Sequence, residues 1–329
     1  MTDAVLNIDF AGQDAVIPFQ VEPLDVRGRS VQLGPMLDTI LDRHKYPDSV
    51  SKLLAEAIAL TVLLGTALKF EGRFILQTQT DGPVSMIVTD FQTPDSIRAY
   101  ARYDEDAIDR AEDKSATSLL GHGTLAMTID QGEYTQRYQG IVELDGANLE
   151  EIACQYFRQS EQIPTDVRLA VGEVLTRQEG QEPKHGWIAG GILIQFLPES
   201  EQRTRQRDIH GGDGDDRDPL ETDEDEAWAE TRILMNTIDE VELTDTNIEP
   251  EKLLYRLFHE HGVRIFDSTK VLDNCSCTDD KVKSMLDGMT EEELAESTEN
   301  GEITVTCQFL QSLLTQVLES CECIQYWLY

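Results

Sequence analysis

Five of the six cysteines lie close together near the end of the chain, between positions 275 and 323, and their types and spacing indicate metal or redox chemistry. Cys275 and Cys277 form a C-x-C pair, and positions 278–306 separate this pair from Cys307. Thiolate sulfurs are good ligands for Zn²⁺, which prefers four ligands in a tetrahedron. We therefore predict that Cys275, Cys277 and Cys307 bind one Zn²⁺ per chain when they are reduced.

The fourth zinc ligand is the open question of this site. Leu310 occupies the position that a C-x-x-C pair would give to its second cysteine, and a leucine side chain cannot bind zinc. Cys321 or Cys323 could replace it, although in a helical segment either would lie about four turns beyond Cys307. Three thiolates and a water molecule are another possibility. Cys154 stands apart, on an apolar helix face, and is predicted to be a core residue.

Composition excludes several classes of partner. The 329 residues carry a net charge of -36, and no run of Lys or Arg offers a patch for nucleic-acid phosphates. The longest apolar stretch, residues 57–68, is too short to span a bilayer, so no membrane partner is expected. The N-terminus has no basic segment followed by an apolar block. We therefore expect a cytoplasmic protein, in which clustered cysteines are more often ligands or redox groups than structural disulfides.

Residues 1–199 are predicted to form an α+β domain with a largely antiparallel sheet and packed helices. Apolar residues at helical spacing indicate helices, and alternating patterns separated by turn residues indicate strands and hairpins. The expected helices cover residues 31–41, 48–64 and 149–160. The expected strands cover residues 74–80, 84–89, 99–103, 124–129 and 134–144, with two more around 167–171 and 192–196.

The rest of the chain divides by composition. Residues 208–230 contain eleven acids and one base, Arg217, which indicates a flexible acidic insert, assigned to 200–230. Residues 231–272 are expected to be a helical linker, with one helix from Pro250 to His261 that Gly262 ends. Residues 273–329 form the small cysteine-rich module, with a strand at 303–307 and helical spacing after it.

Several segments, in order along the chain, resemble one known family. They are LDVRGR (24–29), QTDGP (79–83), RYQGIV (137–142), YFRQSEQIPT (156–165) and LYRLFHE (254–260), followed by Cys275 and Cys277. The chain resembles the redox-regulated 33-kDa heat-shock chaperones, a family of bacterial holdases. In that family a C-x-C pair is followed by C-x-x-C, after a spacer about as long as the one in this chain. Cys307 fits this spacing, and Leu310 departs from the pattern.

The resemblance implies an ATP-independent chaperone, not an enzyme, which binds unfolding proteins during oxidative stress and prevents their aggregation. In the reduced, inactive form zinc holds the module folded. Oxidation turns Cys275, Cys277 and Cys307 into redox-active disulfide residues, zinc leaves, the linker loosens, and the chain forms a homodimer. In the family the cysteines of each pair join to each other, which Cys275 and Cys277 could still do, whereas Cys307 lacks its near partner.

Two hypotheses explain Leu310. One is a single-nucleotide frameshift near codon 310, which would make residues 311–329 an out-of-frame tail. The other is a true variant in which Cys321 or Cys323 is the replacement ligand. Two other functions also remain open: a thiol-disulfide oxidoreductase that uses Cys275 and Cys277, and a structural zinc module that recruits a partner protein.

Overall fold

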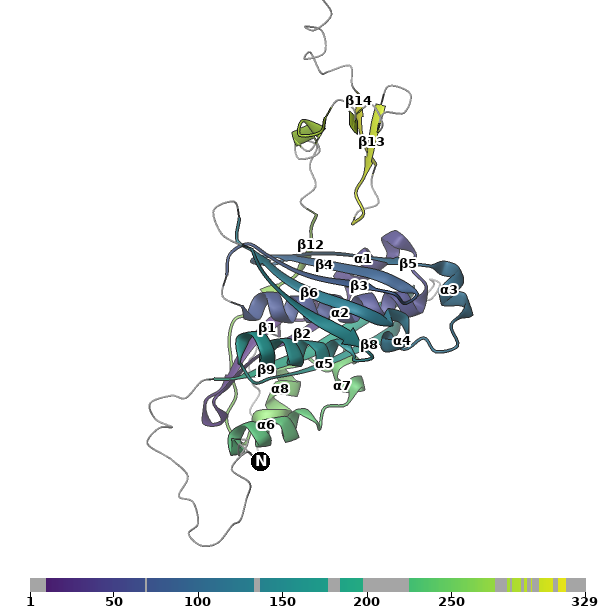
Figure 1. Ribbon diagram of the computed structural model, residues 1–329. Helices are drawn as coiled ribbons and strands as arrows, with labels where there is room; N and C mark the ends of the chain where they lie inside the picture. Colours follow the sequence, from purple (N-terminus) through teal and green to yellow (C-terminus); the bar gives the residue numbers. More distant parts are fainter. Residues whose placement is uncertain are drawn as a thin grey trace, which may run out of the picture.

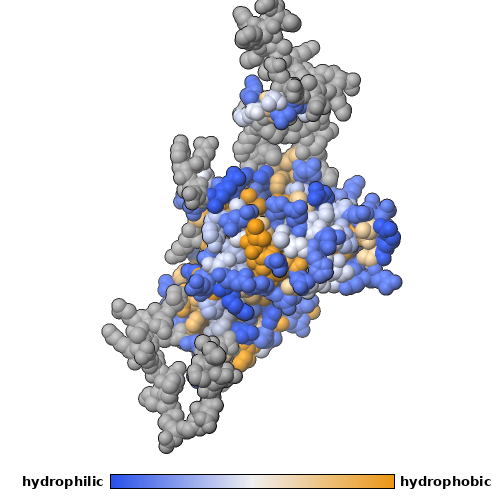
Figure 2. All heavy atoms as spheres, viewed as in Figure 1, coloured by the Kyte–Doolittle hydropathy of each residue, from blue (hydrophilic) through white to orange (hydrophobic). Residues whose placement is uncertain are grey.

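Two six-stranded sheets with a long helix between them form the body of the protein (Figure 1). The computed structural model describes residues 10–68, 70–132, 137–176, 184–197, 225–275, 283–284, 286–290, 293–294, 297, 302–309 and 313–317. Figure 2 shows hydrophobic residues gathered near the centre of one face, with hydrophilic residues around them. The mixture of helices and mainly antiparallel sheets confirms the predicted α+β class.

The helix between the sheets is α2, Asp48–Ala67, and it is apolar on nearly every side. It contacts β2, β8 and β9 of one sheet and β3, β4 and β5 of the other. Its length and composition would allow it to cross a membrane, but 83% of its apolar window is buried within the protein. The apolar stretch found in the sequence is therefore the core helix, as an all-round apolar pattern predicts.

The first sheet, sheet A, has the order β10-β1-β2-β9-β8, and β11 also pairs with β1. Alternate residues of its strands face opposite sides. In β9, Leu193 packs in the cluster around α2, whereas Ile192 and Ile194 face the other side. The strands are β1 Ala15–Val21, β2 Val26–Leu33, β8 Thr165–Thr176, β9 Lys184–Phe196, β10 Arg264–Ile265 and β11 Thr269–Lys270.

The second sheet, sheet B, has the order β12-β5-β4-β3-β6-β7, and only the β12–β5 pair is parallel. Phe74 and Leu76 of β3 are buried against α2, as alternation predicts. The strands are β3 Arg73–Thr80, β4 Val84–Gln92, β5 Ser96–Tyr103, β6 His122–Asp130, β7 Tyr138–Asp145 and β12 Leu272–Asp273. Helices α3 Glu105–Arg110, α4 Ala116–Leu120 and α5 Leu149–Tyr156 connect strands, and a π-helical turn, Phe157–Glu161, follows α5.

Three linker helices cover the second face of sheet A. They are α6 Glu226–Met235, α7 Glu240–Thr244 and α8 Pro250–Phe258. Trp228, Leu254 and Phe258 are buried in one cluster with Ile192 and Ile194 of the sheet. The cover is closely fitted, because a Cβ atom on Gly190 would lie 2.0 Å from the carbonyl oxygen of Leu243. The linker thus hides apolar surface that would otherwise face water.

Three sequence predictions about local structure differ from the described residues. Val31 belongs to β2, and the helix α1, Pro35–His44, starts later, where proline takes the first helical position. After Cys307, β14 Leu313–Val317 pairs with β13 Glu302–Thr306, so this part is strand although its leucines have helical spacing. Pairing with a neighbouring strand overrides such short-range periodicity. In addition, α6 begins at Glu226, inside the range assigned to the acidic insert, and residues 198–224 lie outside the described part.

Candidate redox and metal centre

Cys275 and Cys307 lie side by side although 32 positions separate them in the sequence. Cys275 follows β12, which pairs with β5, and Cys307 follows β13. Their Sγ atoms are 3.8 Å apart, and Cys307 is only 6% exposed. A disulfide requires an S–S distance of about 2.05 Å, so Cys275 and Cys307 are not joined to each other by a disulfide here. Cys277, Leu310, Cys321 and Cys323 lie outside the described residues.

The separation of the two sulfurs fits shared metal binding. Two sulfurs that bind one tetrahedral Zn²⁺ at about 2.3 Å lie about 3.8 Å from each other. This is the distance between the Sγ atoms of Cys275 and Cys307. Within the described residues no group of three or more His, Cys, Asp or Glu side chains surrounds a common point. The predicted ligand set is therefore brought together in part, and the complete set remains a prediction.

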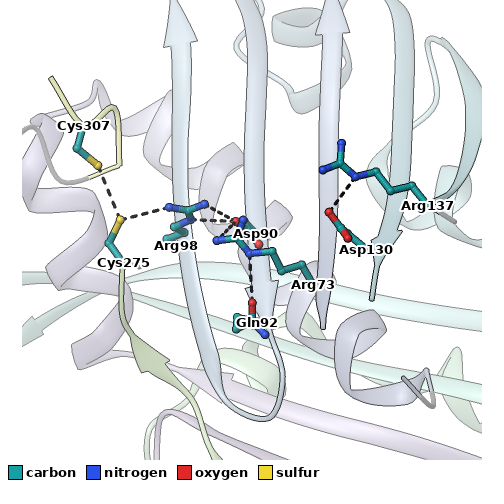
Figure 3. A network of polar contacts seen from close by, with 8 residues as sticks. All are labelled: Arg73, Asp90, Gln92, Arg98, Asp130, Arg137, Cys275 and Cys307. Carbon is teal, nitrogen blue, oxygen red and sulfur yellow. Dashed lines mark hydrogen bonds and ion pairs between the residues drawn. The ribbon is translucent and has the colours of Figure 1, made fainter. Parts of the chain in front are cut away.

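A guanidinium group lies next to this pair (Figure 3). Arg98 on β5 donates from Nη1 to the Sγ atom of Cys275 at 3.3 Å. It also donates from Nε and Nη2 to Oδ2 of Asp90 on β4, at 2.9 and 2.6 Å. A positive charge next to sulfur favours the thiolate, which is the form that binds metals and reacts with oxidants. Burial acts to lower the pKa of Arg98, but Cys275 and Asp90 outweigh it, and the net pKa is raised.

The carboxylate of Asp90 holds the guanidinium of Arg98 in place. The Asp90 side chain is 4% exposed, and Arg73 lies 3.7 Å from the same Oδ2 atom. Arg73 in turn donates to the side-chain oxygen of Gln92 at 3.2 Å. A buried carboxylate without a partner carries a large desolvation cost, so Asp90 and Arg98 stabilise each other's position. The sulfur of Cys275 is thereby connected to the middle of sheet B.

The residues after Cys307 dock on the same surface. The Phe309 ring lies under the guanidinium of Arg98, 4.1 Å from ring centre to Cζ, and meets the Tyr100 ring edge-on at 5.1 Å. The Phe309 carbonyl oxygen lies 3.4 Å from Nε2 of His44, at the end of α1. The pKa of His44 is lowered, mainly by burial. Arg98 therefore contacts both cysteine-bearing segments.

The segment before Cys275 is attached equally directly. Arg43 on α1 makes a two-pronged ion pair with Asp273, and its Nη1 donates at 3.1 Å. The backbone N–H of Asn274 donates to the carbonyl oxygen of Ile97 at 3.2 Å. The position of Cys275 is thus set by β12 and by a residue of α1.

Sequence reasoning missed the partners of the cysteines. Arg98 is 177 positions from Cys275, and no spacing rule connects them. The one available signal was the alternation in β5, where Ile97, Ala99 and Ala101 are buried and Arg98 therefore faces outward. Cys154, predicted to be a core residue, packs against the main core from α5, and burial raises its pKa to about 11. It is an unreactive thiol at neutral pH.

The fold and the paired cysteines define an α+β protein with a thiol centre attached to one sheet and a helical linker covering the other. Comparisons with known proteins agree on its family. The family model described as "Hsp33 protein" matches residues 14–312. Two relatives, each called "33 kDa chaperonin", come from Caulobacter vibrioides strain NA1000 and Ectopseudomonas mendocina strain ymp. The first is 41% identical over 301 residues, covering 90% of this chain and 92% of the relative. The second is 34% identical over 296 residues, covering 88% of each chain.

A solved structure extends the comparison to the fold. The 33 kDa chaperonin of Thermotoga maritima superposes with a TM-score of 0.70 over 93% of this chain and 95% of its own, at 20% identity. The chain belongs to the Hsp33 family, and the resemblance found in the sequence is confirmed. Its function is that of a heat-shock chaperone.

Proposed function

We propose that this chaperone is an ATP-independent holdase whose activity depends on the oxidation state of its C-terminal cysteines. The observation that carries the proposal is the contact between Cys275 and Cys307, 3.8 Å apart and joined to sheet B through Arg98. Reduction keeps this contact and the inactive form. Oxidation under stress breaks it and lets the protein bind unfolding clients. No catalytic role is assigned to the cysteines.

Cys275, Cys277 and Cys307 are the proposed ligands of one Zn²⁺ in the reduced form, with Cys321 or Cys323 as the fourth. When bound, zinc would hold together a segment too small to fold on its own core. The protein's contribution is to place two sulfurs at the required distance and to set the guanidinium of Arg98 against the sulfur of Cys275. The frameshift hypothesis for residues 311–329 remains the rival explanation of Leu310.

Activation is a two-electron oxidation of two cysteines. The first thiolate attacks one oxygen of hydrogen peroxide, the O–O bond breaks, and a sulfenic acid and hydroxide form. The second thiolate attacks that sulfur, the S–S bond forms, and a second hydroxide leaves; both hydroxides take protons to become water. Cys277 is the proposed partner of Cys275. Because Cys307 lies 3.8 Å from Cys275, it is the competing partner.

The effect on client binding passes through the linker. Its helices cover Ile192, Ile194 and other apolar residues of sheet A, so loosening them would expose a surface that unfolded chains can bind. The linker also carries exposed apolar side chains, with Ile233 65% exposed and Val241 64% exposed.

We propose residues 1–199 as the client-binding and dimerisation domain, 200–230 as the acidic insert, 231–272 as the linker and 273–329 as the switch module. Homodimer formation on oxidation and a cytoplasmic location complete the proposal.

The test compares reduced and peroxide-treated protein in the same aggregation assay, without ATP. Light scattering of a heat-unfolded reporter protein should fall only after peroxide treatment. Zinc content should drop from about one per chain toward zero, and peptide mapping should show a disulfide at Cys275. Equal suppression by both forms would mean that the oxidation switch is absent, and the zinc and disulfide measurements would show which step is lost.

A further inference from the structure

One extended segment, residues 264–274, covers an edge of both large sheets, and we name it the strap. It joins the linker to Cys275. In sheet A, Ile265 of β10 pairs with Phe19, and Thr269 of β11 pairs with Val16, so both short strands lie along the outer edge of β1. In sheet B, Leu272 of β12 pairs with Ser96 at the outer edge of β5. Without the strap, both edges would present unpaired backbone groups.

The strap is held by backbone hydrogen bonds and by the polar side chains of Lys270 and Asp273, and little by buried apolar side chains. Its pairing with β1 is interrupted between Ile265 and Thr269. In this gap stands Pro18 of β1, which accepts a hydrogen bond from the backbone N–H of Phe266 at 3.0 Å but has no N–H to return. Of the strap's side chains, Val271 alone is buried, and Phe266 is 39% exposed. Little apolar burial would be lost if the strap left this edge.

A cavity of about 700 Å³ lies beside the same edge, at the end of α2. Thr269 of the strap lines it, so the cavity adjoins the strap. Arg29 also lines the cavity, and its guanidinium donates to the carbonyl oxygen of Thr66 at 3.4 Å. Its apolar lining is supplied by Val16, Pro18, Leu68, Phe70, Phe91 and Pro94.

We propose that the outer edge of β1 is a docking site for an extended segment of a client polypeptide, which takes the place of the strap and inserts an apolar side chain into the cavity. The strap itself shows that extended backbone pairs there. This inference rests on the proposed function, because oxidation at Cys275 is what would free the strap. Backbone pairing depends little on sequence, as a chaperone for many clients requires.

The first experiment uses substitutions in the strap to expose the outer edge of β1 without oxidation. Phe266→Pro with Thr269→Pro removes two strap N–H groups that face β1, whereas Phe266→Ala with Thr269→Ala makes similar side-chain losses and keeps them. Each full-length, reduced, zinc-loaded variant is mixed with a twelve-residue peptide that alternates Val with Thr and Lys and carries a central benzophenone. After irradiation, mass spectrometry should show at least about fivefold more labelling of residues 14–20 and 65–72 in the proline variant than in the alanine variant.

A second measurement distinguishes backbone pairing from general apolar adhesion. Two versions of the peptide are compared. One carries N-methyl groups on its odd-numbered backbone amides, and the other carries them on its even-numbered amides. Because a strand offers alternate N–H groups to each side, one version should lose about tenfold or more in affinity and the other should keep it. Equal affinities, or labels confined to the linker-covered face around Ile192 and Ile194, would overturn the proposal. Crosslinks from β1 to the strap of a second copy would also overturn it, because the occupant would then be another chain.

The same labelling on peroxide-treated wild-type protein covers the case in which the proline variant fails to fold. If that protein suppresses aggregation but β1 is never labelled, the docking inference fails and the proposed function stands. If the proline variant labels β1 but peroxide does not change aggregation, the redox switch fails and the docking site stands.

Discussion

The two sheets are covered in chemically different ways. On sheet A the linker buries Trp228, Leu254 and Phe258 against apolar strands. On sheet B the cysteine-bearing segments are attached by polar contacts around Arg98 and by the Phe309 ring. Apolar burial does not depend on the oxidation state of sulfur, whereas a guanidinium contact to a thiolate does. Under the proposed redox switch, release would therefore start at sheet B and reach sheet A through the strap.

The largest effect is expected from Cys275→Ser, which removes the sulfur that Cys307 and Arg98 both contact. The variant should lose most of its zinc and suppress reporter aggregation without peroxide. Zinc analysis and light scattering in reducing buffer measure both effects. Cys154→Ser is the matched control and should behave as wild type, because Cys154 packs on the core away from the site. If Cys275→Ser still needed peroxide, the polar contacts on sheet B would not be the switch.

Loss of apolar burial on sheet A should open the linker without touching the cysteines. Phe258 is fully buried on α8, and Phe258→Ala should cost about 3–5 kcal/mol of local stability. Hydrogen exchange of the α6–α8 amides should speed up strongly, while zinc content stays near one per chain. Tyr255→Ala on the same helix removes a 56% exposed side chain and should change the stability by less than about 0.5 kcal/mol. A parallel loss of zinc in Phe258→Ala would show that the two coverings are not separable.

Arg98→Lys weakens, without abolishing, the polar contacts that attach the cysteine-bearing segments to sheet B. Lysine keeps the charge but cannot donate to Asp90 through two nitrogens and stack on Phe309 together. The cost should be about 1–2 kcal/mol, with slower peroxide oxidation of Cys275, measured by trapping of free thiols over time. Arg102→Lys, on the same strand but exposed and bonded to Ser85, is the control. If Cys275 in the Arg98→Lys variant were oxidised at the wild-type rate, Arg98 would have no role in the redox switch.

The sequence predicted the elements whose pattern is local and left out the contacts that join distant segments. The all-round apolar character of α2 and the alternating strands of the β3–β4 and β6–β7 pairs are readable from short windows. Cys275 and Cys307 were found by their type and spacing. Arg98 and the strap could not be found this way, since their partners lie in other parts of the chain. The strand β14 was missed because leucines spaced for a helix pair with β13 instead.

The last expected effect is the pH dependence of stability, and it comes from a residue of the core helix α2. Glu56 on α2 has its pKa raised to about 7, mainly by burial, with further contributions from Glu150 and from Glu240 of α7. The folded state therefore holds a proton that the unfolded state releases near pH 4.5, and stability falls as the pH rises from about 4.5 to 7. Glu56→Gln removes this loss and should stabilise the protein by about 1–2 kcal/mol at pH 8, with little effect at pH 4.5.

Thermal unfolding of the reduced protein at pH 4.5 and pH 8 measures this effect, and hydrogen exchange in α7 locates it. Glu112→Gln, an exposed acid outside the helices, serves as the control and should change neither. The Glu56 pKa is raised by burial, Glu150 and Glu240, none of which is part of the thiol pair, so zinc content should stay constant across the pH range in which stability changes. A pH-dependent loss of zinc cured by Glu56→Gln would instead mean that sheet A controls sheet B, the reverse of the direction inferred from the two coverings.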